Sequence, residues 1–142
     1  MKTTILSLSL MLLFGTAANA QVKTYKEVTT DATMTVNASD CVDRMGKNYL
    51  LWVRYDFNDK KACKKEARRD GVKGKPVREE VLYEFDEYLL TYRIVSKKYY
   101  DKNDAVLKEL IYYQAPWNQV GDTDYSLKLG IYMTGAFNIT AG

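Results

Sequence analysis

Histidine does not occur in this 142-residue chain. The chain therefore has no imidazole for acid–base catalysis, for activating a serine or cysteine nucleophile, or for binding a transition metal. Cysteine and proline occur twice each, and the net charge is only +3. With charges so nearly balanced, binding to a polyanion would have to depend on local clustering of basic residues.

Long apolar runs are also missing, apart from one near the N-terminus. Lys2 is followed by an apolar run over residues 5–14 and by the small-residue site Ala18-Asn19-Ala20. This pattern is typical of a secretory signal peptide over residues 1–20, and the run is too short for a transmembrane helix. We therefore expect residues 21–142 to form a single exported domain, in a periplasm, at the cell surface or outside the cell.

Most of the chain from residue 21 to residue 114 alternates between polar and apolar residues, which is typical of β-strands with one buried face. The strongest strand is predicted at residues 48–57, "NYLLWVRYDF". The turn signal "DKND" at residues 101–104 separates two strand-like runs and predicts a β-hairpin. Residues 78–90 also alternate, although their Glu and Leu content makes a helix the alternative there.

Two segments depart from this alternation. Residues 60–70 are rich in helix formers and predict a short basic helix, which the Gly and Pro of "GVKGKP" would end. Residues 122–135 begin with good N-cap residues and predict a C-terminal helix, in which Gly130 costs about 1 kcal/mol relative to alanine. We therefore expect an α+β fold with a curved, mostly antiparallel sheet of about six strands and one or two short helices.

The segment 60–78 holds nine lysines and arginines among nineteen residues. Such a cluster attracts acidic partners, and its affinity for them falls as salt rises. It has no aromatic residue on which a base could stack, so nucleic acid is not an expected partner of this exported chain. The alternative is a solvated loop whose charges prevent strands from pairing at the edge of the sheet. The candidate binding residues are Lys60, Lys61, Lys64, Lys65, Arg68 and Arg69.

The two cysteines, Cys41 and Cys63, flank the strongest predicted strand. In an oxidising compartment they would form a disulfide that tethers the basic segment beside this strand. Closing a loop of this length would stabilise the fold by about 3 kcal/mol.

Carboxylates recur just before residue 90, and Glu80, Glu84 and Asp86 would share one face of a strand. A hydrolase that used only carboxylates would place them around a concave pocket. The alternative is a polar sheet face with basic cross-strand partners such as Arg93 or Lys97. We favour this alternative and expect no catalytic residues, no metal site and no cofactor.

Several short motifs occur in a characteristic order: a strand with a Trp-Val pair, an "e-f-D" strand, a tyrosine-rich hairpin and a later tryptophan. The matching positions are Trp52-Val53, Glu84-Phe85-Asp86, Tyr92-Arg93-Ile94, Tyr99-Tyr100-Asp101, Val106 and Trp117. This order resembles the surface-adhesin protein E-like family of exported bacterial proteins, over most of residues 47–126. The resemblance implies an adhesin-like protein that binds host extracellular-matrix proteins.

The chain departs from that family in its cysteines. Members typically pair a cysteine just after "e-f-D" with one near the C-terminus, whereas this chain has Glu87 and Tyr88 at the first place and no late cysteine. Our expectation is a non-enzymatic exported binding protein whose partner is a protein or an acidic glycan. The alternative is a periplasmic inhibitor or immunity-type protein that blocks a specific enzyme through a tyrosine-rich face.

Overall fold

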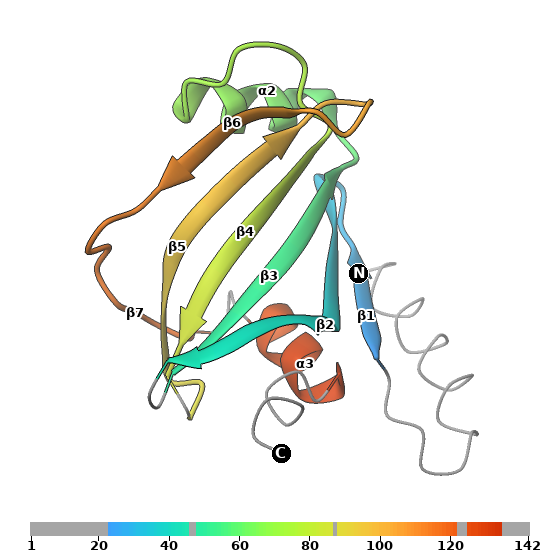
Figure 1. Ribbon diagram of the computed structural model, residues 1–142. Helices are drawn as coiled ribbons and strands as arrows, with labels where there is room; N and C mark the ends of the chain where they lie inside the picture. Colours follow the sequence, from blue (N-terminus) through green and yellow to red (C-terminus); the bar gives the residue numbers. More distant parts are fainter. Residues whose placement is uncertain (1–22, 46–47, 87, 122–124, 135–142) are drawn as a thin grey trace, which may run out of the picture.

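The protein is described from a computed structural model, which covers residues 23–45, 48–86, 88–121 and 125–134. The predicted signal peptide lies outside these residues. These residues form one curved antiparallel sheet with two helices (Figure 1). Its elements in chain order are β1 (Thr24–Val28), β2 (Ala32–Met45), β3 (Asn48–Phe57), α2 (Lys60–Arg69), β4 (Arg78–Phe85), β5 (Thr91–Tyr100), β6 (Val106–Ile111), β7 (Asn118–Gln119) and α3 (Tyr125–Thr134).

The order of strands in the sheet follows the order in the chain, β1-β2-β3-β4-β5-β6, and β7 pairs with the start of β5. The predicted α+β fold and its curved antiparallel sheet are confirmed. The hairpin around residues 101–104 is confirmed as β5 and β6, and both predicted helices are present as α2 and α3. The helix alternative for residues 78–90 is wrong, because β4 occupies Arg78–Phe85.

The apolar positions of the alternating strands form one buried face of the sheet, which we call the inner face. It is defined by Val36, Leu51, Val53, Val81 and Phe85, each 1% exposed or less. Helix α3 packs against β1 and β2 on this face and adds two leucine-sized side chains to the core. The core residues are Tyr25, Met34, Val36, Tyr49, Leu51, Val53, Val81, Tyr83, Phe85, Leu89, Leu127 and Ile131.

The opposite face of the sheet, the outer face, carries the alternate residues of the same strands: Trp52, Arg54, Glu80, Leu82 and Lys98. Arg54, Glu80 and Lys98 lie opposite one another across β3, β4 and β5. This arrangement places opposite charges on neighbouring strands, which stabilises pairing. Both helices lie on the inner face, so neither covers these side chains.

The predicted disulfide is wrong for this structure, in which the two cysteines are not bonded to each other. Cys41 lies on β2 opposite Leu51 of β3. Leu51 is six residues before the end of β3 at Phe57, a distance of about 20 Å along a strand. Cys63 lies on α2, beyond that end, and its thiol donates a hydrogen bond to the carbonyl oxygen of Pro76 at 2.9 Å. A disulfide requires Cα atoms within about 7 Å, so the length of β3 separates the two thiols.

Across the described residues, no helix has both the length and the apolar character needed to cross a membrane.

Candidate functional site

The predicted basic helix forms because both of its ends are capped by its own sequence. Asp59 precedes the helix, and its carboxylate accepts hydrogen bonds from the backbone N–H groups of Lys61 and Ala62, as an N-cap residue does. At the other end Gly71 has a φ of +66°. The N–H of Val72 donates to the carbonyl of Ala67 at 2.8 Å, which together with the positive φ forms a Schellman cap.

Helix α2 is amphipathic, and its two faces differ sharply in charge. Cys63 and Ala67 are buried against the sheet, and Glu66 and Asp70 lie on the same side because residues three or four apart share one face of a helix. Five basic residues of the helix have their side chains exposed to solvent, on the opposite side and flanking the buried one. These are Lys60, Lys61, Lys64, Lys65 and Arg68.

Asp70 points toward the inner face of the sheet and joins α2 to β5. Its carboxylate accepts a hydrogen bond from the hydroxyl of Tyr99 and lies 3.5 Å from the ammonium of Lys97. Both partners are buried, Lys97 to 7% exposure and Tyr99 completely. Burial, and after it the contact with Asp70, raise the pKa of the Tyr99 hydroxyl, so this side chain stays protonated and remains a donor.

Three carboxylates meet beneath α2. One oxygen from each of Glu66, Asp70 and Glu79 lies within 4.8 Å of the others. Burial raises the pKa of Glu79, an effect that Lys97 opposes and that the two neighbouring carboxylates increase. These three residues could offer oxygen ligands to a hard cation, but the ammonium of Lys97 already places a positive charge beside them.

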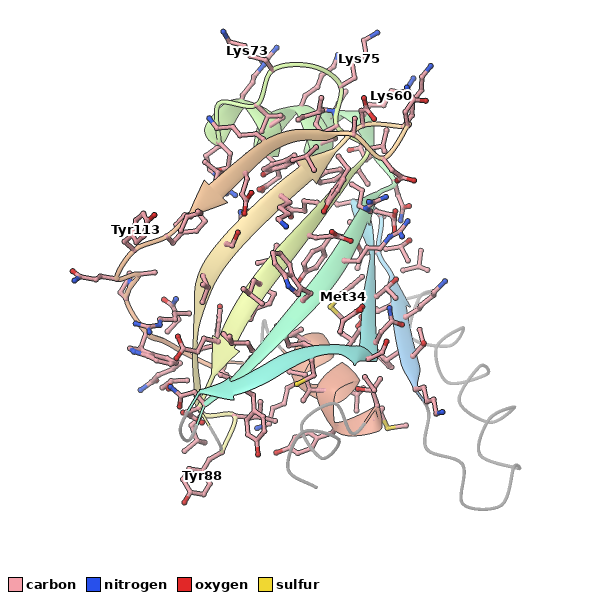
Figure 2. All side chains as sticks on the ribbon, viewed as in Figure 1. Met34, Lys60, Lys73, Lys75, Tyr88 and Tyr113 are labelled. Carbon is pink, nitrogen blue, oxygen red and sulfur yellow. The ribbon has the colours of Figure 1, made fainter. Side chains whose placement is uncertain are left out.

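The exposed side of α2 and the loop after it form a surface of unpaired cations. Seven side chains of the segment 60–78 make no ion pair with a described residue, and we call them the basic surface. Figure 2 shows three of them projecting from one end of the molecule. The basic surface consists of Lys60, Lys61, Lys64, Lys65, Arg68, Lys73 and Lys75.

The structure changes the predicted set of binding residues in two ways. Arg69 forms an ion pair with Glu66 and lies near Asp70, so its charge is neutralised locally. Lys73 and Lys75, which the prediction left out, lie exposed in the loop after α2. Their signal was present in the sequence, since they belong to the same nineteen-residue cluster.

Arg78, the last basic residue of the segment, belongs to the sheet. Its guanidinium lies 4.1 Å from the ring centre of Tyr100 and donates a hydrogen bond to Asp104 at 2.6 Å. The guanidinium of Arg78 is therefore engaged within the protein and is not part of the basic surface.

The carboxylates considered for a hydrolase are held by structural contacts. Glu84 is buried and bonded to Arg93 at 2.6 Å and to Asn48 at 3.0 Å. Asp86 accepts hydrogen bonds from the backbone N–H groups of two residues in the turn that follows β4 and of Thr91, the first residue of β5. The expected cross-strand pairing with Arg93 is confirmed, whereas Lys97 lies on the other face with Asp70.

The tyrosines, on which the inhibitor alternative depends, are divided between the surface and the core, and Tyr88, Tyr113 and Tyr132 are at least 60% exposed. Tyr25, Tyr49, Tyr83 and Tyr99 are each at most 9% exposed. The hydroxyls of Tyr55 and Tyr83 hydrogen-bond to each other at 2.8 Å. These tyrosines therefore stabilise the inner face and do not form a surface for a partner.

The comparisons with known proteins gave no match to this chain among family models, curated proteins or solved structures.

Proposed function

We propose that this chain is a non-enzymatic exported binding protein that holds an acidic partner through its basic surface. The observation that carries this proposal is the division of charge on α2. The two acids of the segment, Glu66 and Asp70, are turned toward the sheet or paired with Arg69. The seven cations of the basic surface are left without ion-pair partners among the described residues.

The chemistry of the basic surface favours a partner that carries several negative charges. Lys61, Lys65 and Arg68 are three or four residues apart, so they form a row along the outer side of the helix, with about 6 Å between successive turns. Of the apolar residues of α2, Cys63 and Ala67 are buried and only the small Ala62 is partly exposed, so the helix has no apolar side to insert into a bilayer. A sulfated glycan or an acidic protein surface matches this arrangement, as an adhesin-like role requires.

Two matched double variants test the proposal. The first, Lys61→Gln/Lys65→Gln, removes two charges from the basic surface. The control, Lys23→Gln/Lys128→Gln, removes one charge just before β1 and one charge from α3. Both elements reach the end of the molecule that lies away from α2 (Figure 1). Binding to immobilised heparin and to a matrix protein is measured for both variants and for the wild type.

We expect the α2 variant to bind the probe at least tenfold more weakly than the wild type, because two cations that contact the polyanion are lost. The control should retain nearly full affinity, although its net charge is the same. Equal losses in both variants would show that binding follows net charge, and the proposal would fail. It would also fail if the wild type bound neither probe.

A further inference from the structure

A second feature of the molecule suggests a binding site that does not involve the basic surface. A hollow of about 250 Å³ opens on the outer face of the sheet. One aromatic ring and four charged side chains converge on it. Its lining is Asp40, Trp52, Val53, Arg54, Glu80 and Lys98.

The hollow arises where β2 loses its register with β3. Val36 pairs with Val53, and Cys41 pairs with Leu51, so residues 37–40 of β2 face a single residue of β3, Trp52. Such an excess of residues forms a bulge, and bulges re-aim side chains beside functional sites. Here the bulge carries Asp40 to the hollow and leaves the side chain of Trp52 half-buried.

Most of the charged groups around the hollow are fixed in place. The guanidinium of Arg54 donates two hydrogen bonds to Asp56, at 2.7 and 2.8 Å. Asp40 accepts a hydrogen bond from the side-chain amide of Asn37 at 2.9 Å. Glu80 hydrogen-bonds to the hydroxyl of Tyr100, and this contact, after burial, raises the pKa of that tyrosine to about 12.

Lys98 differs from its neighbours because it makes no ion pair with any residue that the structure describes. Its ammonium lies 5.0 Å from the centre of the Trp52 ring. Both side chains are only half-buried, so this cation–π contact is weaker than one shielded from water. The lysine can therefore swing away from the ring at little cost and leave the indole face open.

We propose that this hollow binds one pyranose ring of a glycan. The indole of Trp52 offers a flat apolar surface for the C–H face of the sugar. Asp40 and Glu80 accept hydrogen bonds from hydroxyls, while Arg54 and Lys98 donate them, and each sugar hydroxyl can do both. An apolar platform with a few convergent polar groups is typical of a small-ligand site.

The mixture of charges is what selects this ligand class. A simple anion at the hollow would meet the carboxylates of Asp40 and Glu80, and a simple cation would meet Arg54 and Lys98. A sugar satisfies both sets of groups without placing a net charge among them. The volume of the hollow suits a single ring better than an oligosaccharide.

The test uses the fluorescence of Trp52. The chain has two tryptophans, so Trp117→Phe leaves Trp52 as the single reporter. Methyl glucoside and methyl galactoside are titrated into this variant of the full chain, with a free amino acid as a zwitterionic comparison. We expect a saturable change in Trp52 emission at millimolar concentrations of at least one of the sugars.

Two carboxyl-to-amide variants, Glu80→Gln and Asp40→Asn, are expected to weaken this binding about tenfold each, because each loses a hydrogen bond to a charged group. The matched control is Glu109→Gln, which makes the same change on β6, opposite Lys98 but outside the hollow. The affinity of this control for the sugar should be unchanged. Thermal unfolding confirms that each variant is folded, and either carboxyl variant suffices for the test.

The proposal is overturned if no sugar produces a saturable response, if only the amino acid does, or if Glu109→Gln weakens binding as much as the two hollow variants. The Lys61→Gln/Lys65→Gln variant should bind the sugars like the wild type. The outcome for the hollow is therefore separable from the outcome for the basic surface.

Discussion

Glu79 shows how a single residue couples the sheet to the basic helix. One of its carboxylate oxygens is buried and has no hydrogen-bond partner among the described residues. Glu66 and Asp70 lie beside it, and burial is the main cause of its raised pKa. Because the folded state holds the proton of the Glu79 carboxyl more tightly than the unfolded state does, protonation of Glu79 contributes to stability, and this contribution is complete below pH 4.5. That contribution is lost as the pH rises through the raised pKa.

We therefore predict that Glu79→Gln makes the protein more stable at pH 7.5. The amide carries no charge and can donate a hydrogen bond to the neighbouring carboxylates. The expected gain in the free energy of unfolding is about 1 kcal/mol, the lower end of the cost of an unsatisfied buried polar group. Urea unfolding at pH 7.5 and at pH 4.5 measures it, and the gain should shrink at the lower pH.

The control for this variant is Glu109→Gln, which changes an exposed carboxylate on β6. It should alter the stability little at either pH. If Glu79→Gln were less stable than the wild type at pH 7.5, the ionised carboxylate would be needed beneath α2, and the description of this cluster would be wrong.

The two thiols give a second prediction at the scale of the residue. Protein purified without a reductant and then unfolded in denaturant should react with two equivalents of a thiol reagent. In the folded protein Cys63 should react slowly, because it is buried and burial raises the pKa of its thiol. If almost no thiol reacted after unfolding, the two cysteines would be joined by a disulfide, and the structure described above would be contradicted.

The sequence could predict some of these residue contacts and not others. Cross-strand pairing of Glu84 with Arg93 followed from the alternation of β4 and β5, because opposite charges on facing strands attract. The position of Lys97 could not be predicted, since a bulge in β5 after Ile94 moves it to the inner face. A shift of one residue reverses the face of every later side chain, and no local signal marked this one.

Helix α3 shows why an unfavourable residue can be required within an element. Gly130 lowers helix propensity, yet it lies where α3 packs closely against residues of β1 and β2. A Cβ atom at this position would lie 2.9 Å from Cδ1 of Tyr25 and 3.0 Å from Cγ2 of Val36. Both side chains belong to the packed core, so neither can move aside freely.

We predict that Gly130→Ala destabilises the protein by about 1–3 kcal/mol, the usual cost of overpacking a core. This loss should exceed the gain of about 1 kcal/mol in helix propensity. The control is Gly121→Ala, since a Cβ at Gly121 meets no atom within 4 Å. Thermal unfolding of both variants measures the difference, and a higher melting temperature for Gly130→Ala would show that α3 does not pack this closely.

The strands and helices themselves followed well from the sequence. Period-two alternation located the strands, and the helix-forming residues between Asp59 and Gly71 located α2. The bulge at residues 37–40 of β2 did not follow, because it depends on how β2 curves against β3. The hollow over Trp52 exists because of that bulge, so this site was not visible before the structure.

At the scale of the whole molecule, the two ends of the sheet differ in character. One end carries α2 and the basic surface, while α3 fills the inner face toward the other end (Figure 1). The net charge of the chain is only +3, yet the basic surface concentrates seven cations that form no ion pair with a described residue. The central claim is that this concentration, and not the net charge, holds an acidic partner.

The salt dependence of heparin binding tests this claim most directly. The logarithm of the affinity should fall linearly with the logarithm of the salt concentration. The slope should become less steep by about one for each lysine removed from α2 that contacts the polyanion, and it should be unchanged in Lys23→Gln/Lys128→Gln. A slope that is the same in the wild type and in Lys61→Gln/Lys65→Gln would contradict the account.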